Sequence, residues 1–356
     1  MTPIVDQKKF DAFGATLTNV LNHSGLALMI SIGHRTKLFD VMATLGHATS
    51  DEIATKAGLS ERYVREWLGA MTTGGVIEHD AEKHTYRLPA EHAGWLTRAA
   101  SPNNFAAAMQ WAAVLGQVED EIVDAFTHGK GVPYSSYKRF HIVMAEESAQ
   151  SVVAVLFTHL LPLVPGLIEK LESGIDVLDI GCGSGRAINE MAAHFPNSRF
   201  HGYDASPEGI AAAQQEADGR QLSNAKFAVK DVAHLKDDKS FDLITAFDAI
   251  HDQADPAGVL SCIAKGLKPD GVFLMQDISG SGHVHGDMKH PFGPFLYTVS
   301  CMHCMSVSLA SGGPGLGAMW GREKALAMLS DAGFKNVVVN ELPHDPMNFY
   351  YVATLR

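Results

Sequence analysis

The sequence is poor in cysteine and in basic residues, and it lacks a long apolar run. Four cysteines in 356 residues are too few for a disulfide scaffold, which favours a reducing compartment. Forty acidic against 28 basic residues give a net charge of −12, so a basic face for nucleic acid or an anionic membrane is not expected. No apolar stretch has the length of a bilayer span, and the N-terminal segment lacks the ending of a signal peptide. We therefore expect a cytoplasmic globular protein.

The first third of the chain has the pattern of a winged-helix domain, expected over residues 1–100. Residues 7–45 have helical periodicity, and Thr49 or Ser50 then begins a short helix that Gly58 ends. Ser60 begins a second helix, and "VIEHDAEKHTYRL" after Gly74-Gly75 alternates as a β-hairpin does. The second helix carries its apolar positions on one face: Val64, Trp67, Leu68 and Met71.

A winged helix suggests DNA binding, but its charges do not support that function. Residues 51–88 contain five Lys or Arg against seven Asp or Glu, and Arg62 and Arg65 are interleaved with Glu61 and Glu66. Phosphate contacts need a positive surface. The alternative is that this unit and the long apolar first helix pack against another subunit.

The rest of the chain divides into a helical linker over 101–170 and an α/β domain over 171–356. The apolar runs "DVLDIG", "RFHGYDAS", "AKFAVKD", "FDLITAFDAIH" and "GVFLMQD" alternate with helical segments. This alternation predicts a Rossmann-like, doubly wound parallel sheet. "KNVVVNELP" and "NFYYVATL" are expected as two closing strands, the last pair antiparallel.

The segment "VLDIGCGSG" joins a strand to a loop with three alternating glycines, which suits a ligand that touches the backbone. The loop differs from the G-x-G-x-x-G of dinucleotide enzymes, and no lysine follows it as in a P-loop. Ligands of such sheets bind at the carboxyl ends of the strands, where acidic residues gather here. Asp204 follows Asp179 by 25 residues, a spacing suited to a ribose diol. These carboxylates favour a cationic, phosphate-free nucleoside over a pyrophosphate.

These motifs, with "KDVAHL" and "LKPDGVFLMQD", resemble those of the class I S-adenosylmethionine (AdoMet) methyltransferases in order, spacing and residue type. The resemblance implies that the glycines pass under the methionine part of AdoMet, that Asp204 holds the ribose and that Asp231 with Val232 faces the adenine. It implies a cofactor site made of Asp179, Gly181, Gly183, Gly185, Asp204, Ala205, Asp231, Val232, Phe247 and Asp248. The alternative is a bare strand–helix turn without a ligand.

The order of the domains resembles that of small-molecule O-methyltransferases, in which the winged helix dimerises. We therefore expect a seven-stranded methyltransferase sheet, a small-molecule acceptor and a homodimer. "VPYSSYKRFHIVMAEES" and "HCMSVSLASGGPGLGAMWG" resemble a branch with bacterial, fungal and nematode members, some of which are small-thiol S-methyltransferases.

His251, in "AIHDQADP", is the first candidate for the general base. Plant-type O-methyltransferases have a His-Asp pair at the matching place, which His251-Asp252 reproduces, although Gln253 and Ala254 depart from the family pattern. The alternative is a histidine that only caps the next helix.

A second candidate group follows the fifth strand of the sheet. One interpretation is a zinc site, indicated by a C-x-x-C spacing, and another is ordinary helical packing over 295–308. A third is a wall of soft side chains for a thiol acceptor, in which His303 is a second catalytic group. The metal question stays open for the cluster His283, His285, His290, Cys301, His303 and Cys304. The expected acceptor-binding residues are Tyr134, Phe140, His290, Cys304 and Trp320.

From the sequence we predict AdoMet-dependent methylation of a small molecule, with the sulfur of a small thiol as the first choice of acceptor. The first alternative is O-methylation of a phenol or enol with His251 as base. A methyltransferase of RNA or protein is a further alternative, and the acidic balance disfavours RNA. An AdoMet-sensing winged-helix regulator is the alternative from another class.

Overall fold

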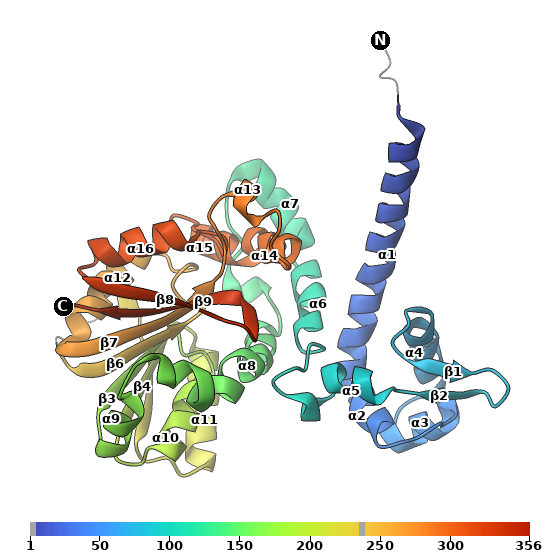
Figure 1. Cartoon of the computed structure of the whole chain (residues 1–356), viewed down its shortest axis with the longest axis horizontal. Helices are drawn as coiled ribbons and strands as arrows, with labels where there is room; N and C mark the ends of the chain where they lie inside the picture. The colour runs from blue at the N-terminus through green and yellow to red at the C-terminus, as the bar shows by residue number, and fades with distance from the viewer. Residues whose placement is uncertain (1–4, 235–238) are drawn as a thin grey trace. The chain divides into compact units, whose positions relative to one another are not determined.

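A computed structural model describes residues 5–234 and 239–356, and Leu235 of the "KDVAHL" motif lies outside them. The chain forms two compact units, Met1–Gly116 and Gln117–Arg356 (Figure 1). A separate helical linker was expected over 101–170. In the structure residues 101–116 group with the first unit, and residues 117–170 group with the second unit.

The first unit is helical with a small wing, as expected from its capping signals. Thr49 and Glu52 form a reciprocal capping box at the start of α3, Ser50–Ala57, and Gly58 ends that helix with a φ of 67°. Ser60 precedes the second helix without a side-chain capping bond. The apolar positions of the second helix are buried, with Trp67 and Met71 at 2% exposure or less. The elements are α1 Gln7–Arg35, α2 Leu38–Ala43, α3 Ser50–Ala57, α4 Glu61–Thr73, β1 Glu78–Asp80, β2 Thr85–Arg87, α5 Ala90–Leu96 and α6 Trp111–Gly116.

Helix α1 leaves large apolar side chains uncovered over most of its length. Its C-terminal end packs on α4, where the indole of Trp67 donates to the Met29 carbonyl at 2.8 Å. Further toward the N-terminus, Phe10, Phe13 and Leu21 are each more than 60% exposed in the single chain. An apolar face of this size is typical of a surface that meets a partner.

The second unit contains a seven-stranded sheet in the order β5-β4-β3-β6-β7-β9-β8 (Figure 1). β9 is antiparallel to both of its neighbours, and the strands from β5 to β7 are parallel. The expected doubly wound sheet with an antiparallel closing pair is confirmed. The strands are β3 Asp176–Ile180, β4 Arg199–Asp204, β5 Ala225–Val229, β6 Phe241–Phe247, β7 Leu267–Ile278, β8 Asn336–Leu342 and β9 Asp345–Thr354.

Helices cover both faces of the sheet, and each face has its own core. Val177 of β3 belongs to the core that includes Met191 and Phe195, whereas Leu178 belongs to the core that includes Ile263 and Leu329. Adjacent residues of a strand point to opposite faces of the sheet, and this alternation produces the division. The helices are α9 Leu167–Ser173, α10 Arg186–His194, α11 Pro207–Gly219, α12 Pro256–Gly266 and α16 Arg322–Asp331.

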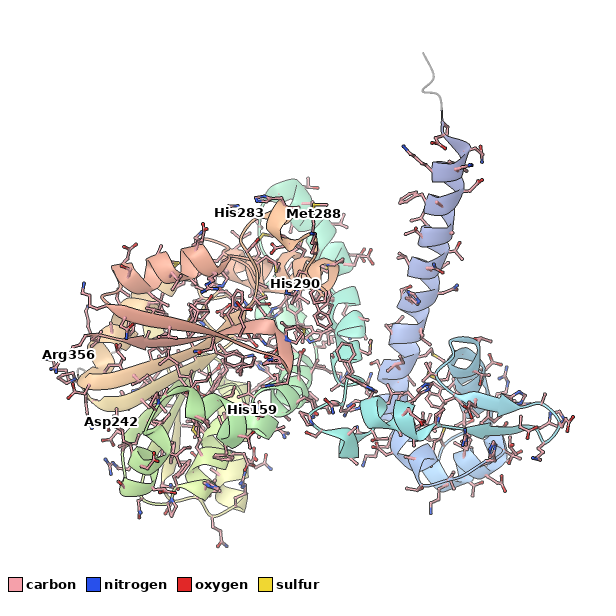
Figure 2. All side chains as sticks on the ribbon, viewed as in Figure 1. His159, Asp242, His283, Met288, His290 and Arg356 are labelled. Atoms are coloured by element: carbon pink, nitrogen blue, oxygen red, sulfur yellow. The ribbon has the colours of Figure 1, made fainter. Side chains whose placement is uncertain are left out.

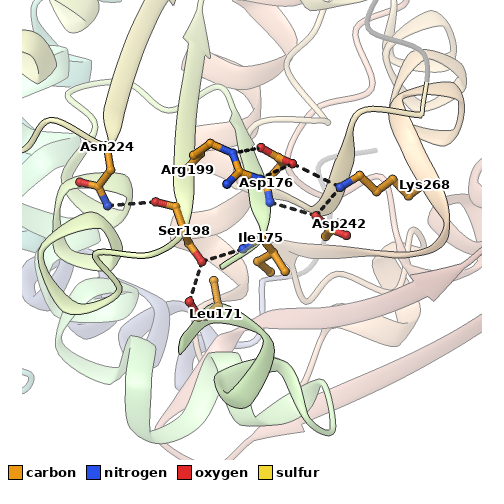
Figure 3. Close-up of polar contacts among 8 residues, drawn as sticks. All are labelled: Leu171, Ile175, Asp176, Ser198, Arg199, Asn224, Asp242 and Lys268. Carbon is orange, nitrogen blue, oxygen red and sulfur yellow. Dashed lines mark hydrogen bonds and ion pairs between the residues drawn. The ribbon is translucent and has the colours of Figure 1, made fainter. Parts of the chain in front are cut away.

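Charged side chains tie the strands together at the amino edge of the sheet (Figure 3). Arg199 pairs with Asp176 at 2.6 Å, and Lys268 bridges Asp176 at 3.2 Å and Asp242 at 2.7 Å. These residues stand at or near the strand starts. The network therefore lies at the edge opposite to the carboxyl edge, where ligands of this fold class bind.

Two segments outside the sheet pack on each other in the second unit. The first contains α7 Glu119–His128, a 3₁₀ turn Tyr134–Ser136 and α8 Phe140–Ser151. The second follows β7 and contains α13 Val284–Asp287, α14 Gly293–Val299, a π-helical turn Ser300–Cys304 and α15 Met305–Ala310. A β-carbon at Gly131 would lie 1.8 Å from the Ser306 carbonyl oxygen, and the Val132 N–H donates to Ser306 Oγ at 2.8 Å.

One segment has the length and composition of a membrane-crossing helix, contrary to the expectation that no such run exists. The segment is Phe140–Leu163. Core helices of globular proteins can meet the same criterion of length and composition. Its Val152, Leu156, Leu160 and Leu161 are buried in the core that contains Met191 and Phe195.

Candidate active site

The glycine loop after β3 has the backbone that a close ligand requires. Gly181, Gly183 and Gly185 have φ values of 68°, 51° and 69°, a left-handed region that favours glycine. A β-carbon would lie 2.4 Å from Cβ of Ala249 at Gly181, and 2.6 Å from Ala213 at Gly185. At Gly183 it would meet no protein atom within 4 Å. The loop is therefore packed at two glycines and open at the middle one.

Asp204 at the end of β4 is held in place by two backbone donors. Its Oδ2 accepts from the Gly183 N–H at 2.8 Å, and its Oδ1 accepts from the Ser206 N–H at 2.7 Å. Each oxygen keeps acceptor capacity for a hydroxyl. Ser206 caps α11 through Gly209 and lies 3.2 Å from His141 Nε2, which ties α8 to this loop.

Asp179 is a buried carboxyl within β3. It accepts from Thr245 Oγ1 at 2.7 Å, and burial, aided by the charge of Asp204, raises its pKa to about 7. Asp231 follows β5, is exposed and accepts from the Ala233 N–H, while Val232 is buried beside it. All ten predicted cofactor residues lie in or after β3, β4, β5 and β6, toward the carboxyl edge.

His251 and Asp277 form a hydrogen-bonded pair that is shielded from solvent. His251 Nδ1 lies 2.8 Å from Asp277 Oδ1, and the two residues are 3% and 0% exposed. The same oxygen accepts from the Trp320 indole at 2.9 Å and from the Ile278 N–H at 2.8 Å. Because Asp277 can only accept when ionised, Nδ1 carries the proton and Nε2 faces away from the carboxylate.

The hydrogen-bond partner of His251 is therefore Asp277, and the adjacent Asp252 of the His-Asp sequence pair has a different partner. Asp252 instead accepts a hydrogen bond from the Tyr134 hydroxyl. The capping alternative is wrong, because Asp255 caps α12 by accepting from the Gly258 N–H at 2.9 Å.

Two histidines of the site have pKa values displaced in opposite directions. Burial opposes the charged form of His251, but the charge of Asp277 outweighs it and raises the pKa of His251 well above its usual value. The His251 ring also hydrogen-bonds the thiol of Cys304, whose pKa burial raises. Burial, with the charges of His251 and His141, lowers the pKa of His303 to about 3.

Aromatic rings enclose His303. Phe140 stacks on it with ring centroids 4.3 Å apart and planes 12° apart. Tyr137 and Tyr134 meet it edge-on at 4.8 and 5.3 Å. The structure thus brings Tyr134, Phe140, His251, His303 and Cys304 together.

Other predicted residues lie elsewhere. His290 Nε2 is 2.9 Å from Ser279 Oγ and its Nδ1 accepts from the Phe292 N–H, so His290 braces the loop after β7. His283 and His285 are exposed and stack at 5.5 Å, and Figure 2 labels His283 and His290 on this insertion. Across residues 5–234 and 239–356, no three His, Cys, Asp or Glu side chains are placed to hold a metal ion. The Trp320 indole is buried and reaches the site through Asp277.

Comparison with known families identifies both domains. Residues 24–98 match the Rv2258c-like winged HTH domain, and residues 171–312 match a methyltransferase domain. The chain thus joins a winged-HTH domain to a methyltransferase domain.

Two curated relatives each match about a third of the chain. The ubiquinone biosynthesis O-methyltransferase of Idiomarina loihiensis is 30% identical over 123 residues, which are 33% of this chain and 49% of that protein. The trans-aconitate 2-methyltransferase of Deinococcus radiodurans is 32% identical over 107 residues, 30% of this chain and 39% of that protein. The chain thus spans about half or less of the length of these relatives.

Solved structures share the fold of the whole chain. A putative O-methyltransferase from Nostoc punctiforme has a TM-score of 0.71 at 18% identity and covers 95% of this chain and 98% of its own. Human N-acetylserotonin methyltransferase with bound SAM has a TM-score of 0.68 at 17% identity and covers 99% of both chains.

Sequence reasoning missed the role of Asp277 in this methyltransferase. The signal was present, because "GVFLMQD" ends a predicted strand with a carboxylate one strand away from His251. The pairing of β6 with β7 brings these two strand ends together. The contact of Tyr134 with Asp252 joins residues 118 positions apart and had no sequence signal.

Proposed function

We propose that the protein transfers the methyl group of AdoMet to a hydroxyl oxygen of a small molecule, a phenol or an enol. The observation that carries the proposal is the buried His251–Asp277 pair. An imidazole with a raised pKa is a base suited to an acceptor that titrates near pH 10.

The cofactor fits the carboxyl edge of β3 to β6. AdoMet supplies the methyl group as an electrophile bound to sulfur. We assign its methionine part to the glycine loop, whose open position at Gly183 leaves room for a ligand. We assign the ribose to Asp204 and the adenine to Asp231 and Val232, with Ala205 and Phe247 beside them. The buried carboxyl of Asp179 lies in β3 just before the loop and ties this strand to β6 through Thr245.

The chain's own residues then place the acceptor and remove its proton. Holding the acceptor in line with the methyl group can account for about 7–11 kcal/mol of the barrier. His251 Nε2 takes the hydroxyl proton, and Asp277 stabilises the resulting imidazolium. His303 acts as a neutral wall rather than as a second base, because a pKa of about 3 makes it a weak proton acceptor. Tyr134, Phe140 and Cys304 line the acceptor side, while Trp320 and His290 only position other groups.

A thiol acceptor is the second candidate, favoured by one observation. The ring of His251 already hydrogen-bonds a sulfhydryl, that of Cys304. A free thiol titrates near pH 8.5 and needs less help from a base than a phenol does.

We further propose a cytoplasmic homodimer without a nucleic-acid partner. The uncovered apolar residues of α1 support self-association. On α4, Arg62 pairs with Glu66 and Arg65 pairs with Glu61, so its arginines are balanced by carboxylates of the same helix. This balance also counts against an AdoMet-sensing DNA regulator.

The test is transfer from labelled AdoMet to a panel of phenols, enols and small thiols. We expect labelled phenol or enol products, with transfer lost in His251→Ala and retained in His290→Ala. Transfer to thiols alone, unaffected by His251→Ala, would contradict the proposed acceptor and the proposed base. Tight binding of AdoMet without transfer to any acceptor would contradict the enzymatic function.

A further inference from the structure

Several buried acceptor oxygens of the second unit lack a hydrogen-bond partner, among them Oδ2 of Asp277, and three others lie just after β6, on β7 and on β9. They are Oδ1 of Asp248, Oε1 of Gln276 and Oδ1 of Asn348. Gln276 is fully buried and Asn348 is 4% exposed. Buried polar atoms are nearly always hydrogen-bonded, so several unpaired acceptors together indicate a donor that arrives from outside the chain.

The register of the sheet places these residues side by side. Gln276 pairs with Tyr350 across β7 and β9, and Asn348 precedes Tyr350 by two positions, which puts it on the same sheet face. Asp248 follows β6, and its N–H donates to the Gln276 carbonyl at 3.0 Å. Asp345 completes the group by accepting from Asn348 Nδ2 at 2.8 Å and from Tyr350 at 2.6 Å.

Carboxylates fix the orientation of both amides. Gln276 Nε2 donates to Asp248 Oδ2 at 3.3 Å, and Asn348 Nδ2 donates to Asp345. Because these donors are used, each amide has its carbonyl oxygen as the group without a partner. The group therefore offers acceptors only.

Several carboxyl groups lie around this place. Burial raises the pKa of Asp248 well above its usual value, and the charges of Asp277, Asp345 and Glu147 add to this effect. Among these contributors a protonated His251 is the one cation, and its charge lowers the pKa of Asp248. A cation bound here would relieve the repulsion among these carboxylates.

The backbone of Asp248 is also unusual. Its φ is 52°, in the left-handed region that residues other than glycine seldom adopt. Such strain persists where the surrounding structure holds a side chain in place for function.

We propose that Asp248, with the carbonyl oxygens of Gln276 and Asn348, binds a protonated amine of the acceptor. The inference rests on the proposed function, narrows its acceptor to amino-bearing hydroxyl compounds, and assigns Asp248 to the acceptor instead of the expected cofactor site. Strand order favours the acceptor over the methionine ammonium of AdoMet as the source of the amine. β7 and β9 lie on the opposite side of β6 from β3 and β4, which carry the glycine loop and Asp204.

The test uses acceptors that differ only in the amine. Tyramine and 4-ethylphenol share the phenol and differ by the ammonium group. Their Kd values for the complex with S-adenosylhomocysteine (AdoHcy) and their kcat/KM values would be measured for wild type and Asp248→Asn. Asp270→Asn is the control, because Asp270 is an exposed carboxylate that pairs with Arg356 far along the sheet.

Wild type is expected to bind tyramine about 10- to 100-fold more tightly than 4-ethylphenol, the range of one charged hydrogen bond. Asp248→Asn should abolish most of this preference and leave the AdoHcy affinity unchanged, and Asp270→Asn should alter neither. Asparagine tolerates a positive φ, so the variant should fold, which thermal unfolding checks.

Equal affinity of wild type for the two phenols would overturn the inference. If both phenols were still methylated in that case, the proposed function would remain intact. Weakened AdoHcy binding in Asp248→Asn would also overturn it, because the amine would then be that of the cofactor. If neither phenol is methylated but tyramine still binds preferentially, the proposed function fails and the amine site stands.

Discussion

His251 and Asp277 meet at 2.8 Å through Nδ1 and Oδ1, and the carboxylate oxygen accepts two further hydrogen bonds, from Trp320 and from the Ile278 N–H. All three contacts place a donor on the same oxygen of Asp277, so the proton of His251 lies on Nδ1. The pair thus has one defined tautomer and one nitrogen left to accept a proton.

The first prediction concerns the pH dependence of this pair. A base acts only when unprotonated, so kcat/KM for a phenol should rise with pH through the raised pKa of His251, with a midpoint above 6.5. Asp277→Asn removes the charge that raises the pKa, so the midpoint should move to lower pH and the plateau should fall by about 10²- to 10⁴-fold. pH–rate profiles of both proteins test this. A midpoint that does not move would mean that another group is the base.

The second prediction separates binding from folding within the glycine loop. Gly183→Ala meets open space, so its folding cost should be the backbone strain of about 1 kcal/mol, whereas the affinity for AdoHcy should fall at least tenfold. Gly185→Ala would press against Ala213 and Phe227, so it should lower the melting temperature more. Calorimetric titration and thermal unfolding measure the two effects. Unchanged AdoHcy affinity in Gly183→Ala would place the ligand elsewhere.

The third prediction concerns the buried carboxyl of Asp179. Its folded pKa of about 7 exceeds the ordinary value of 3.8, so the folded state holds the proton more tightly than the unfolded state. The stability that this provides is present at low pH and is lost as pH rises through about 7, on the order of a few kcal/mol in total.

Asp179→Asn keeps an acceptor for Thr245 and cannot ionise. Its free energy of unfolding should match or trail wild type at pH 4 and exceed it at pH 8. Denaturant unfolding at the two pH values provides the check. Parallel curves for the two proteins would show that Asp179 is ionised throughout.

The fourth prediction concerns Gly131, which lies directly against α15. A β-carbon there would lie 1.8 Å from the Ser306 carbonyl oxygen and 2.3 Å from the Ala310 nitrogen. Gly131→Ala should therefore displace the segment that carries Tyr134 and lower activity together with stability, by about 1–3 kcal/mol of unfolding free energy. Gly219→Ala, where a β-carbon meets nothing, is the control. Wild-type stability and activity in Gly131→Ala would contradict this packing.

Local signals account for what the sequence predicted well. The capping box at Thr49, the glycines of the loop and the strand-end carboxylates act within a few residues, so their patterns identify winged helix, sheet and cofactor loop. The partner of His251 depends instead on the register between β6 and β7. A linear pattern shows the adjacent Asp252 but does not show that Asp277, 26 residues away, lies beside His251.

The acceptor side was predicted less well for the same reason. Phe140, His303 and Cys304 were expected there because their side chains suit a soft pocket, and the structure brings them together. His290 was included on residue type alone, and its hydrogen bonds with Ser279 and Phe292 direct it to the loop instead.

Methyl transfer to a matched phenol and thiol by wild type and His251→Ala tests the central claim most directly. Labelled AdoMet, 4-methylphenol and 4-methylthiophenol would be used at one pH above the midpoint for wild type. The account predicts a labelled methyl ether from wild type, with a loss of about 10²- to 10⁴-fold in His251→Ala. An undiminished rate of ether formation in that variant, or no transfer by wild type to either acceptor, would contradict it.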